Sequence, residues 1–187
     1  MDKLKSVLLR RLKIRPAGLA ECDAIRSLIN TSARTLAAGD YTIEQIEVAL
    51  QGVWGLDTQL VRDGTYFVAE HDDIIAGCGG WSWRRTLFGG DALGSRDDRP
   101  LDAETEPAKI RAFFVHPNYA RQGIGSRILE HCEREARSLG FRQLELGATL
   151  PGERLYRAHG YISGEPYAYE CQPGKFMTII PMSKQLA

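Results

Sequence analysis

The chain has 187 residues, of which 43% are hydrophobic and 26% charged, and its 24 basic and 24 acidic side chains leave no net charge. This length and composition are typical of one compact globular domain, so we expect residues 1–187 to form a single domain. Without a basic excess, nucleic acid is not expected as a partner. No apolar run approaches the length of a transmembrane helix, so no membrane partner is expected either.

The sequence predicts a cytoplasmic protein. The apolar stretch within residues 1–10 is too short for a secretory signal, and no small-residue cleavage site follows it. The four cysteines, Cys22, Cys78, Cys132 and Cys171, are far apart and form no C-x-x-C pair. This spacing favours reduced thiols packed as small hydrophobic residues.

The N-terminal third of the chain predicts one strand and two helices. Residues 11–16 alternate between apolar and polar and predict a strand. Apolar residues then recur at helical spacing over roughly 18–37. Thr42 is placed to cap a second, shorter helix that continues through Leu50.

Two strands and a long loop are expected next. Strand-forming residues fill 65–70 and 74–83, and Asp72-Asp73 between them predicts a turn. The second strand contains three glycines, which indicate close backbone approach or a bulge: Gly77, Gly79 and Gly80. A polar loop that contains glycine covers about 85–107.

The rest of the chain returns to alternating strands and helices. Residues 109–115 read as a buried strand, and an apolar stripe from Ile124 to Leu139 predicts a helix that ends at Gly140. The remaining elements are a strand around Leu144 and Leu146, a short helix over about 151–159, and strands over about 161–170 and 175–182.

This order of elements predicts the α/β (α+β) fold class. We expect a single mixed, mostly antiparallel sheet of about seven strands, flanked by helices on both faces. The β-α-β unit from 109 to 148 should supply the parallel part of the sheet.

The turn between the strand at 109–115 and the next helix is the most informative stretch. Gly123 and Gly125 fall where the helix begins, and Arg121 adds a positive charge beside them. The first turn of a helix leaves four N–H groups without intrahelical partners, and glycines let a phosphate approach them closely. The turn therefore predicts a cradle for a pyrophosphate.

The turn has one structural alternative, and two other phosphate-binding motifs do not match it. The two glycines could simply shape the passage from loop to helix. A Rossmann motif would need a third glycine where Ile128 stands, and a P-loop would need a Gly-Lys-Ser/Thr sequence that is missing.

The same region resembles the GCN5-related N-acetyltransferases, the GNAT family, whose signature is Gln/Arg-x-x-Gly-x-Gly/Ala. Gly123-x-Gly125 matches it, although Ala120 stands at the first signature position. Three further segments are similar to family motifs, in the family's order: Phe113-Phe114-Val115-His116-Pro117, Leu144-Glu145-Leu146 and Leu155-Tyr156-Arg157-Ala158-His159-Gly160-Tyr161.

The resemblance implies an acyl-CoA N-acyltransferase fold and acetyl-CoA as cosubstrate. In this fold the fourth and fifth strands would splay apart to receive the pantetheine arm of the donor. A main-chain N–H in the gap would polarise the thioester carbonyl. The residues expected to bind coenzyme A are Phe114, Val115, Arg121, Gln122, Gly123, Ile124, Gly125 and Ser126. Tyr156 is expected to protonate the leaving thiolate, with a packing role as the alternative.

The general base is left open by the sequence. The strand at 109–115 has no carboxylate. Glu106 and Glu145 lie nearby, with a solvated surface charge as the alternative role for each, and His116 is expected on the phosphate side of the cleft. A base acting through water, or an amine that arrives neutral, are the other options. Pro151 stands where the family often has an asparagine. No residue spacing matches a metal site, and no cysteine is placed for an acyl-enzyme route.

We therefore expect transfer of an acetyl group from acetyl-CoA to the primary amine of a small molecule, by direct attack in a ternary complex. The alternative is a coenzyme A-binding regulatory or scaffold module without catalysis. The resemblance also makes a homodimer an option, and the final strands carry Tyr161, Tyr167, Tyr169 and Phe176.

The acceptor site is expected under the 85–107 loop. Its acid-rich part, 97–106, would attract a cationic amine. Trp81 and Trp83 could supply a wall of that site, with core packing as the alternative. The region from Arg34 to Tyr41 is the second place considered for the acceptor.

Overall fold

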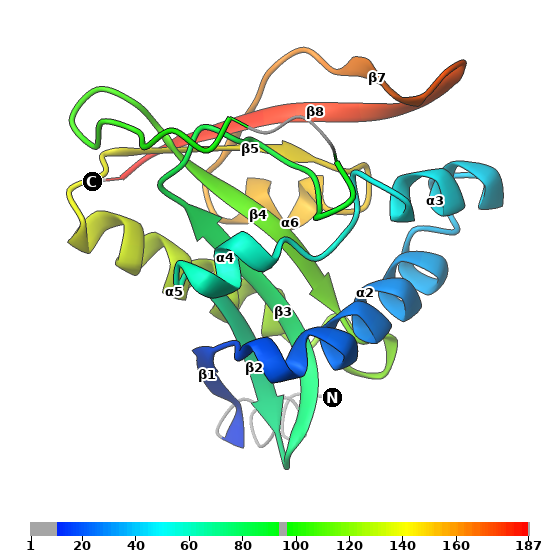
Figure 1. The fold of residues 1–187 in the computed structure, drawn as a ribbon, viewed down its shortest axis with the longest axis horizontal. Coiled ribbons are helices and arrows are strands. Elements are labelled where there is room, and N and C mark those ends of the chain that lie inside the picture. The colour runs from blue at the N-terminus through cyan, green and yellow to red at the C-terminus, as the bar shows by residue number, and fades with distance from the viewer. Residues whose placement is uncertain (1–10, 94–96, 187) are drawn as a thin grey trace.

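A computed structural model describes residues 11–93 and 97–186, and Figure 1 shows their arrangement around one sheet with helices on both faces. The helices are η1 (Leu19–Glu21), α2 (Cys22–Leu36), α3 (Ile43–Leu50), α4 (Thr58–Arg62), η2 (Pro117–Tyr119), α5 (Ile124–Ser138) and α6 (Glu153–Ala158). The strands are β1 (Lys13–Pro16), β2 (Tyr66–His71), β3 (Ile74–Ser82), β4 (Ala108–Val115), β5 (Gln143–Ala148), β6 (Ile162–Ser163), β7 (Tyr167–Gln172) and β8 (Lys175–Gln185).

The sheet has the strand order β1-β2-β3-β4-β5-β8-β6, and β7 pairs with β8. β4 and β5 are parallel, and the other pairs among the described strands are antiparallel. The predicted mixed, mostly antiparallel sheet is therefore confirmed. It has eight strands where about seven were expected, because the segment predicted as one strand over 161–170 forms β6 and β7 on either side of Gly164-Glu165-Pro166.

Two helices cover the opposite faces of the sheet. α5 buries an apolar stripe that contains Ile128, Leu129 and Cys132, and α2 buries one that contains Ile25 and Ile29. Fully burying an Ile or Leu side chain stabilises the fold by roughly 1.5–3 kcal/mol. These stripes therefore hold both helices firmly against the strands between them.

A β-bulge interrupts the regular pairing of β3 with β4. Two β4 residues, Ala112 and Phe113, face one β3 residue, Gly79, and Ala112 has a left-handed φ of 54°. A Cβ at Gly79 would lie 2.7 Å from the Phe113 ring, so glycine is required there. The hydroxyl of Tyr66 donates to the Ala112 carbonyl at 2.8 Å and holds the bulge in place. Because a bulge bends its strand, this one turns the end of β4 away from its neighbour β5.

Most predicted elements are confirmed, and one helix was missed. Thr42 caps α3 by accepting from the Gln45 N–H, as expected. The missed helix α4 has five residues, which is too short to show a helical period, and Asp57 caps it by accepting from the Gln59 N–H. Gly140 and Gly174 have the positive φ angles that helix ends and tight turns favour.

The cysteines are free thiols, and three of them are buried. Burial raises the pKa of Cys78 to about 12, which leaves it unreactive near neutral pH. The expected packing role of the cysteines is therefore confirmed for all but the half-buried Cys171.

Trp81 is also buried and packs edge-on against Phe141.

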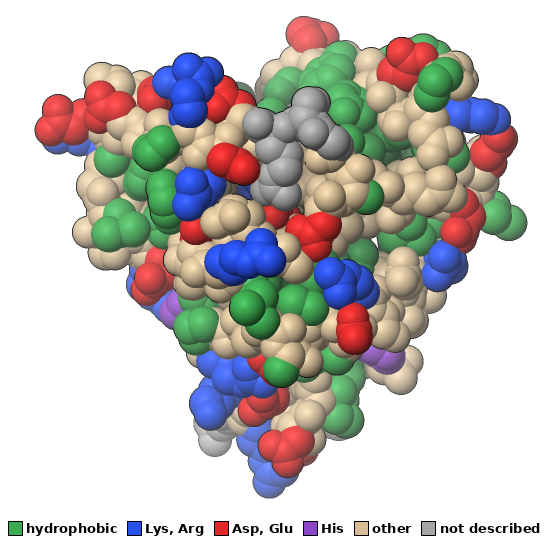
Figure 2. Space-filling model, viewed as in Figure 1, with side chains coloured by type: hydrophobic (Ala, Val, Ile, Leu, Met, Phe, Trp, Pro, Cys, Tyr) green, Lys and Arg blue, Asp and Glu red, His purple; other side chains and the backbone are tan. Residues whose placement is uncertain are grey.

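Figure 2 shows one face of the molecule, with acidic and basic side chains interspersed over it and hydrophobic side chains gathered at the upper right, over β7 and β8. Of the aromatic residues on the final strands, Tyr161 is buried, whereas Tyr167 and Phe176 are exposed. A homodimer stays a prediction. No helix among residues 11–93 and 97–186 is both long and apolar enough to cross a bilayer.

Candidate active site

The start of α5 forms a cradle of main-chain N–H groups. Gly123 is the N-cap residue and has a left-handed φ of 91°, and no side chain caps the helix. The first intrahelical bond runs from the Arg127 N–H to the Gly123 carbonyl at 3.1 Å. The N–H groups of Gly123, Ile124, Gly125 and Ser126 are therefore the unpaired donors expected at a helix N-terminus.

The loop that leads into the cradle is shaped by hydrogen bonds to its main chain. His116 Nδ1 accepts from the Asn118 N–H at 3.2 Å, and Gln122 Nε2 donates to the Asn118 carbonyl at 3.0 Å. Arg121 has a left-handed φ of 63° and an exposed side chain. Its guanidinium makes no ion pair with any residue in the described part of the chain, so it is available to an anion at the cradle.

β4 and β5 separate beyond their first residues. Their parallel pairing consists of Ala108 with Leu144 and Lys109 with Glu145. Figure 1 shows the two strands diverging from there, β5 staying beside β8 while β4 continues beside β3. Within the described sheet, the main chain of β4 from residue 110 to 115 thus has no strand partner on the β5 side. The splayed strands expected from the family resemblance are present.

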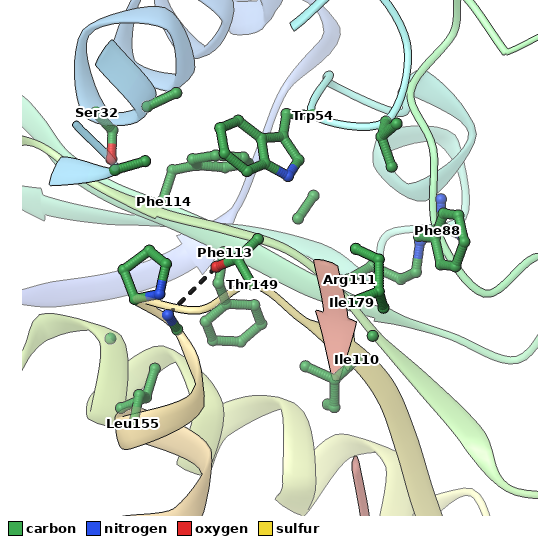
Figure 3. Close-up of a pocket in the computed structure, with 18 of the residues that line it drawn as sticks. Ser32, Trp54, Phe88, Ile110, Arg111, Phe113, Phe114, Thr149, Leu155 and Ile179 are labelled. Atoms are coloured by element: carbon green, nitrogen blue, oxygen red, sulfur yellow. Dashed lines mark hydrogen bonds between the residues drawn. The ribbon is translucent and has the colours of Figure 1, made fainter. Parts of the chain in front are cut away.

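A cavity of about 260 Å³ fills the space between the separated strands. One side is lined by Gly125 of α5 and by Leu155 and Tyr156 of α6. Figure 3 shows Leu155 on this side, below the strands. The other side is lined by α2 and by the segments 53–55 and 87–89, and Figure 3 shows Ser32 and Trp54 there. The gap therefore connects the α5 face of the sheet with the α2 face.

Glycine at position 125 keeps α6 close to the cradle. A Cβ there would lie 3.1 Å from Leu155 Cδ2 and 3.9 Å from Val115 Cγ2. The end of β4, the cradle and the start of α6 therefore meet at one place. An extended ligand with an anionic end fits this geometry, with its anion at the N–H groups and its other end along β4.

Tyr156 lies inside the cavity and is only 8% exposed. Its ring packs edge-on against Phe113 and Tyr161. Its hydroxyl forms no hydrogen bond with any residue that the structure describes. Burial raises the pKa of Tyr156, so the phenol stays protonated at neutral pH and can donate a proton.

Arg111 is a buried cation in the wall of the same cavity. Its guanidinium pairs with Asp57 at 2.9 Å, and both side chains are at most 2% exposed. It also donates to the carbonyls of Thr86 and Gly89, each at 2.7 Å. Arg111 thereby ties β4 to the segment before α4 and to the 86–89 segment, and the Asp57 carboxylate balances its charge. This pair could not be predicted from the sequence because its members are 54 residues apart.

The GNAT acetyltransferase family matches residues 26–161 of this sequence. The chain belongs to the GNAT family. No curated protein matches it significantly.

Solved structures have the same fold at low sequence identity. A GCN5-related N-acetyltransferase from Rhodopseudomonas palustris aligns with a TM-score of 0.68 and 17% identity, over 93% of this chain and 95% of the other. The PaiA N-acetyltransferase of Thermoplasma acidophilum, solved with coenzyme A, gives 0.63 and 14%, over 94% and 99%. The ribosomal-protein-alanine N-acetyltransferase of Brucella melitensis gives 0.62 and 20%, over 93% and 99%.

As a GNAT acetyltransferase, the protein is an enzyme that uses acetyl-CoA as its acyl donor. The open N–H groups of the cradle suit the pyrophosphate of this donor, and the unpaired edge of β4 suits its extended arm. The residues described contain no group of His, Cys, Asp or Glu that could hold a metal ion.

The three residues of this sequence considered as the general base all lie outside the cavity lining. Glu145 pairs with Lys109. Glu106 pairs with Arg85 at 2.7 Å. His116 caps η2 from outside the cavity. Among the described lining residues there is no carboxylate and no imidazole.

The 85–107 loop, which was predicted to cover the acceptor site, reaches the cavity through only part of its length. Leu87, Phe88 and Gly89 do line the cavity, but no described residue of the acid-rich part 97–106 does. That part folds on itself, with the Asp97 carboxylate held by Arg99 at 2.6 Å. Trp81 is in the core and Trp83 stacks against Arg84, so neither forms a wall of the cavity.

The second region considered for the acceptor, Arg34 to Tyr41, does contribute through Leu36 and Ala37. Tyr41 anchors it, because its hydroxyl donates to the Thr178 carbonyl and accepts from the Leu150 N–H, each at 3.0 Å. Pro151 lines the cavity as well, at the entrance to α6.

Proposed function

We propose that the protein transfers the acetyl group of acetyl-CoA to the primary amine of a small molecule, by direct attack within a ternary complex and with residues 1–187 as one catalytic domain. The observation that carries this proposal is the gap between β4 and β5, because it joins an anion cradle on one side to the cavity wall formed by α2 and the loop segments on the other.

On the donor side, the N–H groups of Gly123, Ile124, Gly125 and Ser126 would hold the pyrophosphate. Arg121 would add a charge-assisted contact, and Gln122 would hold the loop through its bond to Asn118. Phe114 and Val115 offer main-chain groups at the open edge of β4. Those groups would align the pantetheine arm as an added strand.

Acetyl-CoA supplies an activated thioester whose carbonyl carbon the amine nitrogen attacks. A C–N bond forms, the C–S bond breaks, and the nitrogen loses one proton to water. A β4 main-chain N–H would polarise the carbonyl oxygen, and the Tyr156 hydroxyl would give its proton to the departing sulfur. Tyr156 then recovers a proton from solvent, so the products are an amide and a free thiol.

Replacing Tyr156 with Phe tests the acid role. We expect kcat to fall about 100-fold, because acid catalysis contributes at least this much and the substitution removes only the hydroxyl. The affinity for coenzyme A, measured by calorimetry, should stay unchanged. Measuring kcat by thiol release under saturating substrates checks the expectation.

Tyr161→Phe is the matched control. Its hydroxyl is buried beside Glu133, and Tyr161 does not line the cavity. This variant should keep kcat, because the hydroxyl that it removes does not reach the cavity. Equal losses in both variants would mean that Tyr156 only packs against its neighbours.

A further inference from the structure

The side of the cavity formed by α2 and the loops is a preformed apolar surface. We call it the acceptor wall and define it by Leu36, Trp54, Phe88, Phe114 and Ile179. The two loop segments that contribute to it are joined by bonds from the Gly90 N–H to the Gly52 carbonyl at 2.9 Å and from the Asp91 N–H to the Leu56 carbonyl at 3.0 Å. The wall is therefore fixed before a ligand arrives.

The described lining of the wall offers no negative charge to a cationic ligand. Among the described lining residues, α2, segment 53–55, segment 87–89 and β8 contribute no titratable side chain. β4 contributes Arg111, paired with Asp57 behind it, and α6 contributes Tyr156. An ammonium group bound here would lose its hydration without gaining a carboxylate partner, because the Asp57 carboxylate is already paired with Arg111.

A base to deprotonate an ammonium is also absent from this lining. Arg111 remains charged at all ordinary pH values, and burial raises the pKa of Tyr156, so neither accepts a proton near neutrality. A strongly basic amine is almost entirely protonated at about pH 7, as lysine side chains are. The site thus suits an amine that is already neutral in solution.

We propose that the acceptor is a small, weakly basic amine on an aromatic or other apolar body, bound against the acceptor wall as the free base. This inference rests on the proposed acetyl transfer and names its substrate class. The apolar body would displace water from the wall, and the neutral nitrogen would face the gap between β4 and β5 without help from a side-chain base.

The direct test compares aniline with benzylamine, which have the same ring but differ greatly in basicity. At about pH 7 we expect kcat/KM for aniline to exceed that for benzylamine by at least about tenfold, and putrescine to be poorer still. The aniline rate should be nearly constant between about pH 6 and 8, whereas the benzylamine rate should rise about tenfold per pH unit.

A second test measures binding rather than turnover, through the melting temperature of the complex with coenzyme A. Aniline should raise its melting temperature, since a ligand that binds the native state stabilises it, and putrescine should not. A higher kcat/KM for benzylamine or putrescine than for aniline would overturn the inference while leaving acetyl transfer intact. Coenzyme A binding without acetylation of any of the three amines would overturn both.

Leu36 allows a matched pair of variants that tests the charge argument. It is 39% exposed on α2, so a polar side chain is tolerated there. Leu36→Glu should raise the preference for benzylamine over aniline about tenfold relative to Leu36→Gln, because only Glu offers a carboxylate to an ammonium. Leu19→Glu, on an exposed residue outside the cavity, should leave the preference unchanged. Equal preferences in the Glu and Gln variants at position 36 would contradict the assignment of this wall to the acceptor.

Discussion

Gly123→Asp is expected to weaken the binding of acetyl-CoA by on the order of 100-fold relative to Gly123→Asn. Gly123 has a left-handed φ of 91°, so both substitutions strain the backbone there, and they do so to a similar extent. The two side chains have nearly the same shape. The difference between them therefore isolates one negative charge placed against the phosphates of the donor.

The same pair should show the opposite order in stability. Without ligand, Gly123→Asp should melt at the same temperature as Gly123→Asn or slightly higher, because an anion at a helix N-terminus is favourable. With acetyl-CoA, only Gly123→Asn should keep a sizeable increase in melting temperature. Calorimetry and thermal melts measure both effects. Equal affinities in the two folded variants would show that the phosphates bind elsewhere.

Asp57→Asn is expected to destabilise the protein by about 3–5 kcal/mol, because it leaves the buried Arg111 without its counter-charge. Asn keeps a side-chain oxygen that can accept from the Gln59 N–H, so the cap of α4 survives. For a chain of this size the melting temperature should fall by roughly 10 °C. Denaturant unfolding measures the change in free energy.

A double-mutant cycle separates the ion pair from its surroundings. R111M alone leaves a buried carboxylate at Asp57 and should be as damaging as D57N. The double variant D57N/R111M should lose clearly less free energy than the sum of the two single variants, because neither charge is then unpaired. Simple additivity would show that the two side chains contribute independently.

The variants that replace Arg111 also remove its hydrogen bonds to the 86–89 segment. In these variants the KM for the amine should rise more than the KM for acetyl-CoA.

The donor side of the site could be predicted from sequence because its signals are local. Gly123 and Gly125 stand next to the helix whose N–H groups they expose, and the apolar stripe of α5 fixes that helix over 15 residues. The separation of β4 and β5 was expected from family resemblance. Its physical cause, the bulge at Ala112 and Phe113, depends on pairing with β3 and is not visible in β4 alone.

The acceptor side could not be predicted in the same way. Leu36, Trp54 and Phe88 come from three segments that only the folded chain brings together. Acidic residues in the 97–106 stretch suggested a cation site, but none of them lines the cavity, and Asp97 and Glu106 pair with Arg99 and Arg85. Glu145 looked like a candidate base because sequence does not show that Lys109 on the neighbouring strand pairs with it.

The most direct test of acetyl transfer at this gap is a paired measurement of both products. The protein is mixed with acetyl-CoA and a weakly basic aromatic amine, and free thiol and acetylated amine are quantified together. We predict that the two appear in equal amounts, that neither appears without the amine, and that Gly123→Asp suppresses both at subsaturating acetyl-CoA. Binding of acetyl-CoA with no thiol release for any amine tested would contradict the account and favour a coenzyme A-binding module without catalysis.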